Sequence, residues 1–411
     1  PGGVNIKLSG VNINVASGTP FEIASTAGKV NLILADGSSN TLKTSAYTNY
    51  AALQKNHSST KGENWLTITC EGALTPEGTF NTEHTCSDSC GSITVAGGYG
   101  GAGIGGGNKG IGMYININGG NISATGGSDA AGIGGGNGGL GKYININGGN
   151  ITANGSTSAA GIGGGSMGMG VDININGGNI TANGGSVNDI GGAGIGSGYS
   201  NSSHDINING GNITANGGNN ANDIGNGSNS YSYNIKITGG NVYASSIGAT
   251  PTNDADVPVN VYRAIFTIPD DTAGGVELDD IRIYKDGTPY NYGMKDTKSI
   301  LIDGAGKLFV YLPTGTYSLN YSDKVYTAVV DTSGNAQFTV AKNEVTNSGG
   351  SAEVTYTGTD FDLDEIDGLF TVDSNAGAPT YSIEAEGTGT GSISGTILTV
   401  TKAGTFNIGL V

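Results

Sequence analysis

All three cysteines of the chain lie between positions 70 and 90, together with one of its three histidines. The set consists of Cys70, His84, Cys86 and Cys90. Three thiolates and one imidazole can hold Zn²⁺ tetrahedrally, and four protein ligands leave no position open for catalysis. We therefore expect structural zinc here. Two alternatives stay open, namely a disulfide between Cys70 and Cys90 that leaves Cys86 over, or three thiols without metal.

A second set of residues appears when similar segments of the chain are aligned. The position just before the first apolar residue of each segment carries Trp65, Tyr114, Tyr143, Asp172, Asp205 and Asn234. If each segment is one turn of a solenoid, these side chains form an outward column with steps of about 4.8 Å. Aromatic faces beside polar groups suit an extended polysaccharide. Alternatively, the rings stack on one another and stiffen the fold.

The two carboxylates of this column raise the question of catalysis. Asp172 and Asp205 would be neighbours, with His204 beside them, and retaining glycosidases use a close carboxylate pair. These residues would lie on an outer face without cleft walls. The only two arginines, Arg263 and Arg282, fall outside the repeats, which disfavours a lyase-type site. We therefore expect a protein that is not an enzyme.

The elements that would position these residues follow from an internal repeat. Near-copies of Ile-Asn-Ile-Asn-Gly-Gly-Asn-Ile-Thr-Ala recur at steps of 29, 29, 33 and 29 residues, and Ala-Gly-Ile-Gly-Gly-Gly recurs with them. The leading isoleucines of the near-copies are Ile115, Ile144, Ile173, Ile206 and Ile235. Each unit holds three short extended pieces and no helical period, which is typical of one coil of a parallel β-helix.

Less regular segments extend this pattern toward the N-terminus. We therefore predict an all-β protein with a right-handed, three-sided parallel β-helix over residues 1–250, of roughly eight coils and roughly 40 Å, with an insertion at 71–90. Isoleucine and alanine should fill the interior. Glycines of the third strand should be exposed and leave a flat outer wall. Outward asparagines should form columns that brace the coils or bind ice or a crystalline polymer.

The chain after the repeats has a different composition. Short alternating runs predict a small β-sandwich over 257–345 and a second, immunoglobulin-like sandwich over 352–411 that ends before it is complete. Asp360, Asp362, Asp364, Glu365 and Asp367 form an acidic run. Its carboxylates could bind Ca²⁺, although the run lacks the glycine of a calcium loop and also fits a solvated strand face.

Charge and hydropathy exclude several classes of partner. The formal net charge is −17, from 34 acidic and 17 basic residues, which argues against nucleic acid and anionic membranes. No apolar run approaches the length of a membrane span. We expect a monomer that binds a polysaccharide or a cell-surface glycan.

Two stretches resemble known families. The repeated Ala-Gly-Ile-Gly-Gly-Gly with Ile-x-Ile-x-Gly-Gly-x-Ile resembles glycine-rich repeats of secreted and cell-surface proteins of Gram-positive bacteria, and the architecture is similar to β-helical carbohydrate-binding domains. The tail from Ile393 to Ile408 resembles bacterial immunoglobulin-like domains of surface adhesins. Both resemblances imply an extracellular, bacterial cell-surface location. The expected function is a non-catalytic, adhesin-like surface protein, with a structural stalk and a polysaccharide lyase or glycosidase as alternatives.

Overall fold

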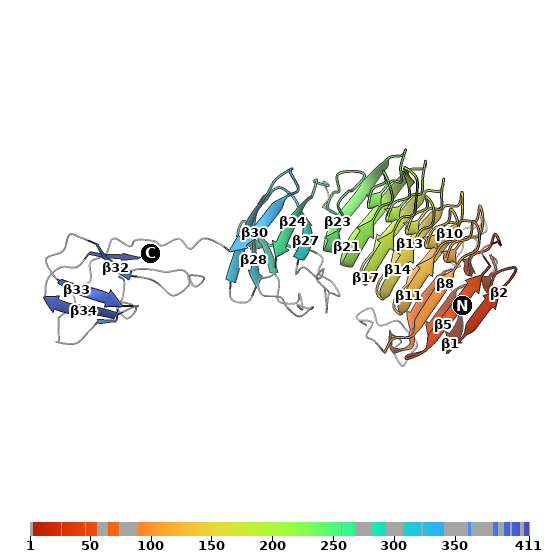
Figure 1. Ribbon diagram of the computed structural model, residues 1–411, viewed down its shortest axis with the longest axis horizontal. Helices are drawn as coiled ribbons and strands as arrows, with labels where there is room; N and C mark the ends of the chain where they lie inside the picture. The colour runs from red at the N-terminus through yellow and green to blue at the C-terminus, as the bar shows by residue number, and fades with distance from the viewer. Residues whose placement is uncertain are drawn as a thin grey trace. The chain divides into compact units, whose positions relative to one another are not determined.

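In the computed structural model, nearly all regular secondary structure of the described residues is β-strand (Figure 1). The structure describes residues 3–25, 27–45, 47–55, 65–73, 89–255, 257–267, 282–292, 307–321, 324–340, 361–362, 381–384, 390–394, 397–402 and 407–410. Within these residues the only helical element is the short 3₁₀ segment η1, Glu71–Ala73. No helix long and apolar enough to cross a membrane occurs in the described part of the chain.

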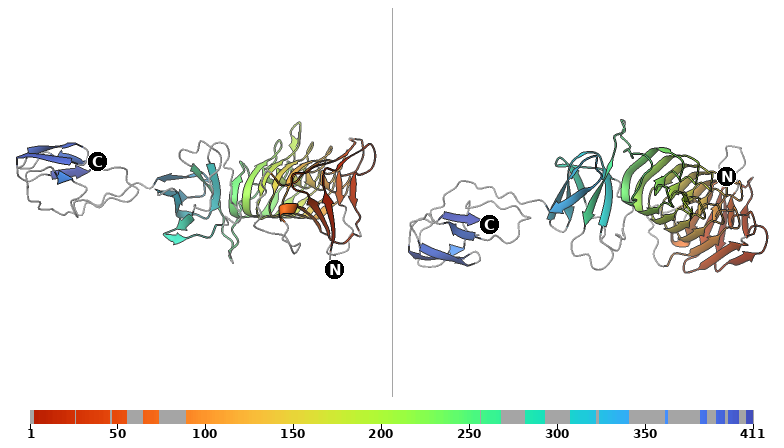
Figure 2. Two further views of the ribbon diagram at one scale, coloured as in Figure 1. Left: turned by 90° about the horizontal axis from the view of Figure 1, so that it is seen from below. Right: turned by 45° about the horizontal axis from the view of Figure 1, so that its top comes forward.

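Residues up to about 250 form a parallel β-solenoid with three strands in each turn. Strands of successive turns lie side by side and pair in parallel (Figure 2). The first face contains β1 (Val4–Leu8), β4 (Val30–Leu34), β7 (Leu66–Cys70), β10 (Gly112–Ile117), β13 (Gly141–Ile146) and β16 (Gly170–Ile175). The second face contains β2 (Asn12–Val15), β5 (Ser39–Thr44), β8 (Ser92–Ala96), β11 (Asn121–Thr125), β14 (Asn150–Asn154) and β17 (Asn179–Asn183).

In the last turns, one long strand runs across both the first and the second face, and a third face closes every turn. Strands β21 (Ser203–Asn216) and β23 (Ser232–Tyr243) each continue from the first face onto the second. The third face contains β3 (Phe21–Ile23), β6 (Leu53–Lys55), β9 (Ile104–Gly105), β12 (Ile133–Gly134), β15 (Ile162–Gly163), β20 (Ile195–Gly196) and β22 (Ile224–Gly225). Strand β23 begins an eighth turn, and an isolated bridge from Ile224 to Ile247 adds the third-face position of that turn. The predicted parallel solenoid is confirmed, and its handedness stays a prediction.

The register of the solenoid places like residues on like residues. Ile115 pairs with Ile144, Ile144 with Ile173, and Ile173 with Ile206. These side chains are fully buried and belong to one continuous apolar core. A single turn could not bury its own apolar face, so the turns are stable only as a stack.

The glycines of the third face differ from the sequence prediction, because they are buried rather than exposed. Gly134 has φ 132°. A Cβ at this position would lie only 2.0 Å from the carbonyl oxygen of Gly163 in the next turn. Glycine therefore allows adjacent backbones to approach closely, and the expected exposed glycine wall does not form.

The turns tolerate extra residues at their corners. The one 33-residue step contains a two-stranded antiparallel hairpin, β18 (Ser186–Val187) with β19 (Ile190–Gly191). The insertion predicted at 71–90 leaves the solenoid directly after β7 and returns before β8. Its residues 74–88 lie outside the described part of the chain.

The described strands between 262 and 340 form a seven-stranded sheet in the order β26-β25-β28-β29-β30-β24-β27. Their bounds are β24 (Tyr262–Thr267), β25 (Arg282–Lys285), β26 (Thr288–Pro289), β27 (Lys307–Leu312), β28 (Gly315–Tyr321), β29 (Lys324–Val330) and β30 (Ala336–Val340). Strand β27 also covers the last turn of the solenoid. The backbone N–H of Phe309 donates to Asn241 Oδ1 at 2.8 Å, and Tyr311 is buried in the solenoid core.

The C-terminal strands form two small antiparallel sheets, β31-β34-β33 and β32-β35. They are β31 (Phe361–Asp362), β32 (Tyr381–Glu384), β33 (Thr390–Ser394), β34 (Ile397–Lys402) and β35 (Asn407–Leu410). Contacts divide the chain into two compact units, Pro1–Tyr317 with Ala328–Phe338, and Ser318–Thr327 with Thr339–Val411. The predicted domain boundaries and the two β-sandwiches stay predictions. Most of the acidic run, including Asp360, Asp364, Glu365 and Asp367, lies outside the described residues.

Candidate functional site

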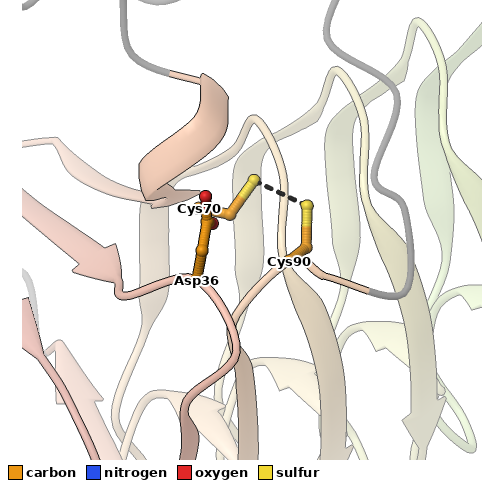
Figure 3. A group of neighbouring side chains, drawn as sticks. All are labelled: Asp36, Cys70 and Cys90. Atoms are coloured by element: carbon orange, nitrogen blue, oxygen red, sulfur yellow. Dashed lines mark hydrogen bonds between the residues drawn. The ribbon is translucent and has the colours of Figure 1, made fainter.

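The base of the 71–90 insertion brings two cysteines together. The backbone path of β7 ends at Cys70, and Cys90 precedes β8. Their Sγ atoms are 2.9 Å apart, and both side chains are buried with Ala73 in a small cluster of their own. Figure 3 shows the two sulfurs directed toward each other.

The structure adds a carboxylate that sequence reasoning missed. Potential ligand atoms of Asp36, Cys70 and Cys90 all lie within 4.8 Å of one another. Asp36 is exposed, and its Oδ1 accepts a hydrogen bond from the backbone N–H of Gly72 at 3.2 Å. Its place follows from register, since Leu34 pairs with Cys70 and Asp36 lies in the next corner. Only a predicted pairing of the N-terminal turns could have found it.

The other two predicted zinc ligands, His84 and Cys86, lie outside the described residues. The structure therefore brings together two of the four predicted ligands, and zinc stays a prediction. Asp36, Cys70 and Cys90 offer one oxygen and two sulfur donors, which suit Zn²⁺ better than Ca²⁺.

The predicted outer column exists, and its backbone has a distinctive conformation. The column consists of Trp65, Tyr114, Tyr143, Asp172, Asp205 and Asn234. All of its members except Trp65 have a left-handed backbone, with φ between 53° and 59°. The residues on either side stay in parallel register, as in the pairs Met113–Lys142 and Ile115–Ile144. One left-handed residue per turn thus repeats along the first face.

The aromatic part of the column forms a continuous stack. Tyr114 and Tyr143 have ring centroids 5.0 Å apart and planes 18° from parallel. Trp65 meets Tyr114 edge to face, at 5.1 Å and 71°. All three side chains are half-buried. Because a ring lying flat is wider than the 4.8 Å step between turns, the tyrosine rings stand on edge and stack face to face along the column.

A lysine joins the aromatic part of the column to its acidic part. Lys142 Nζ lies 4.6 Å from the ring centroid of Tyr143 and 3.3 Å from Asp172 Oδ2. Partial burial lowers the pKa of Lys142, but hydrogen bonds with Tyr143 and Asp172 outweigh this and raise the pKa above its usual value. Asp172 therefore faces a protonated lysine.

The next turns continue the column with a second polar and aromatic group. His204 Nδ1 lies 2.7 Å from Asp205 Oδ2, and Asn234 Nδ2 donates to Asp205 Oδ1. The ring of His204 stacks on Tyr233 at 4.8 Å and 10°, and Tyr233 lies 6.4 Å from Tyr231. Sequence reasoning missed these two tyrosines, because they occupy positions one and three residues before the column residue Asn234. The register pair His204–Tyr233 could have indicated the first of them.

Outward asparagines form hydrogen-bonded ladders, as the repeat predicts. On the first face, Nδ2 of Asn145 donates to Oδ1 of Asn116, and Nδ2 of Asn174 donates to Oδ1 of Asn145, both at 2.9 Å. Parallel ladders begin at Asn118 and Asn121. Each amide satisfies its neighbour in the next turn, so the ladders brace the stack.

Comparison with known protein families agrees with this geometry. A family model described as the Beta helix repeat matches residues 115–137, 144–166, 173–199 and 206–229. This part of the chain is a β-helix domain. Each matched range begins one residue after a column residue, namely Tyr114, Tyr143, Asp172 and Asp205. Comparisons with curated proteins and with solved structures gave no match.

Proposed function

We propose that this protein is a non-catalytic, adhesin-like protein of the bacterial cell surface that binds an extended polysaccharide along the outer column of its β-helix domain. The observation that carries the proposal is the row of aromatic and polar side chains that occupy one outer position of six successive turns, from Trp65 to Asn234. Six turns at about 4.8 Å give a row roughly 24 Å long, which spans several sugars of a linear chain.

The geometry specifies how such a ligand would be held. Tyrosine hydroxyls, the Asp172 and Asp205 carboxylates and the amide of Asn234 offer hydrogen bonds to sugar hydroxyls at a regular step. Stacking on a ring face is restricted, because Tyr114 lies between Trp65 and Tyr143. Trp65, set 71° from Tyr114, is the column residue that retains an orientation suited to stacking on a sugar.

A structural stalk is the second candidate function, and a specific observation favours it. The rings stack on one another, Lys142 pairs with Asp172, and the asparagine ladders satisfy themselves. Such self-contained columns stabilise a solenoid without any ligand. The antiparallel sheets at the C-terminal end support the further proposal of an immunoglobulin-like fold there. Such a domain is compatible with either a glycan-binding protein or a stalk.

A glycan array with the purified protein, followed by affinity measurements on the hits, tests the proposal. We expect Trp65→Ala and Tyr114→Ala each to weaken binding about tenfold or more, because each removes aromatic contact area from the row. Tyr47→Ala is the matched control, since Tyr47 is 96% exposed and lies outside the column. Circular dichroism checks that each variant is folded.

Other outcomes would change the assignment. No binding across the array, or equal binding by all variants, would overturn the polysaccharide proposal and favour the stalk. Release of sugar products from a panel of pectins and glucans, abolished by Asp205→Asn, would show a polysaccharide-degrading enzyme instead.

A further inference from the structure

Cys70 and Cys90 occupy the same position of the solenoid turn. In register, Ile68 pairs with Ile117 and Ser92 pairs with Asn121. Cys70 follows Ile68 by two residues, as Gly119 follows Ile117; Cys90 precedes Ser92 by two residues, as Gly119 precedes Asn121. Both cysteines therefore correspond to the single corner residue Gly119 of the next turn, and the insertion leaves and returns at that corner.

The surroundings of the two sulfurs favour a covalent bond. The Sγ–Sγ separation of 2.9 Å is shorter than a van der Waals contact between sulfur atoms. Two thiolates on one tetrahedral zinc, with Zn–S bonds of about 2.3 Å, would stand roughly 3.8 Å apart. The sulfurs point toward each other, whereas the carboxylate of Asp36 lies to the side of Cys70 (Figure 3). A zinc ion would have to push the sulfurs apart, and a disulfide would draw them together.

We propose that Cys70 and Cys90 form a disulfide that closes the 71–89 insertion at its base. The two thiols lose two protons and two electrons, and a new S–S bond forms. An external disulfide, such as oxidised glutathione, accepts the two protons and the two electrons and is thereby reduced to two thiols. A disulfide of this kind persists in the oxidising extracellular setting of the proposed function, but its formation in a defined redox buffer does not depend on that function.

The purpose of the bond follows from its position. In the next turn Gly119 alone occupies this corner position, whereas here twenty additional residues separate the two strands. A covalent link at the corner restores the short connection between β7 and β8, so that the insertion can vary without loosening the turn. The Cys90 carbonyl also accepts a hydrogen bond from Asn121 Nδ2 at 2.9 Å, which joins the corner to the next turn.

The test is a thiol map of the full-length protein after equilibration with a mixture of oxidised and reduced glutathione. We expect denatured, unreduced protein to accept an alkylating label on one cysteine, Cys86, and reduced protein to accept three labels. Cleavage after Glu83 and Asp88 places Cys86 and Cys90 on separate peptides, and the peptide of Cys70 should then be linked to the peptide of Cys90 alone. Three labels without reduction, a link from Cys70 to Cys86, or one bound zinc per chain by elemental analysis would overturn the proposal.

Single cysteine substitutions test the proposed disulfide by thermal denaturation. Cys70→Ser and Cys90→Ser should each lower the Tm by roughly 5–10 °C. Each variant removes the cross-link that restricts the conformational entropy of the unfolded chain. Reductant should lower the Tm of the wild-type protein by the same amount and leave both variants unchanged. Cys86→Ser is the matched control and should keep the bond and the wild-type Tm. A Tm that is insensitive to reductant in all four proteins would contradict the proposal.

Discussion

The ring of Tyr143 stacks on the ring of Tyr114, with centroids 5.0 Å apart and planes 18° from parallel. The step between solenoid turns sets this distance, because the two residues occupy the same position of consecutive turns. Stacking uses ring faces that a flat sugar platform would expose. The stack therefore braces the turns and leaves ring edges rather than ring faces for a ligand, so substitutions can separate bracing from binding.

The left-handed backbone of the column predicts an unusual order of stability among variants of Tyr143. Tyr143→Ala should lower the free energy of unfolding by about 1–2 kcal/mol, because it removes the stacked ring. Tyr143→Asn should be less destabilising by about 0.5–1 kcal/mol, because asparagine tolerates positive φ and already occupies this position at Asn234. Urea denaturation of both variants gives the comparison. A more stable alanine variant would contradict this account of the column backbone.

Close approach between turns predicts a severe effect of a single methyl group. Gly134→Ala should lower the free energy of unfolding by more than about 4 kcal/mol or prevent folding, because the Cβ would meet the Gly163 carbonyl oxygen of the next turn. Gly138→Ala is the control, since Gly138 has φ 67° but no atom within 4 Å of the added Cβ. It should cost only about 1–2 kcal/mol. Equal effects of the two changes in thermal denaturation would show that the backbone contact is unimportant.

The asparagine ladder predicts a moderate loss of stability at a surface position. Asn145 donates to Asn116 and accepts from Asn174, so Asn145→Ala should remove two hydrogen bonds at a cost of about 1–2 kcal/mol. Thr152→Ala, at an exposed position on the second face, should change stability by less than about 0.5 kcal/mol. Chemical denaturation measures both. If the two variants are equally stable, the ladder contributes nothing.

A buried lysine predicts a pH dependence of stability. The side chain of Lys55 is fully buried, and Nζ has no hydrogen-bond partner among the described residues. Burial lowers the pKa of Lys55 from its usual value of 10.5. The unfolded chain then binds the proton more tightly, so the free energy of unfolding should rise with pH from the lowered folded-state pKa up to about 10.5.

Lys55→Met should remove this rise and stabilise the protein at neutral pH by about 1–3 kcal/mol, because methionine fills the space without an unpaired amine. Lys43→Met, at an exposed position on β5, should change stability by less than about 0.5 kcal/mol. Denaturation series at several pH values distinguish the two. A destabilised Lys55→Met variant would show that the amine is satisfied in solution.

The sequence by itself determined the solenoid, because its period and alternation are local properties. The spacing of Ile115, Ile144 and Ile173 indicates one interior position per turn, and parallel register follows from stacking like residues on like residues. The same spacing predicted which residues share the outer column. It left open whether the rings face a ligand or stack on one another, since that depends on the left-handed backbone at Tyr114 and Tyr143.

Only the tertiary structure showed the contacts between residues that do not occupy equivalent positions of the repeat. Asp36 reaches the cysteines because the corner of one turn lies beside the corner of the next, and Lys142 reaches Asp172 across a similar step. The third-face glycines look exposed in an alternating pattern, but the carbonyl of the following turn covers them. A repeat specifies which positions are equivalent. The space around each position depends on the packing of the neighbouring turns, which becomes defined only when the chain is folded.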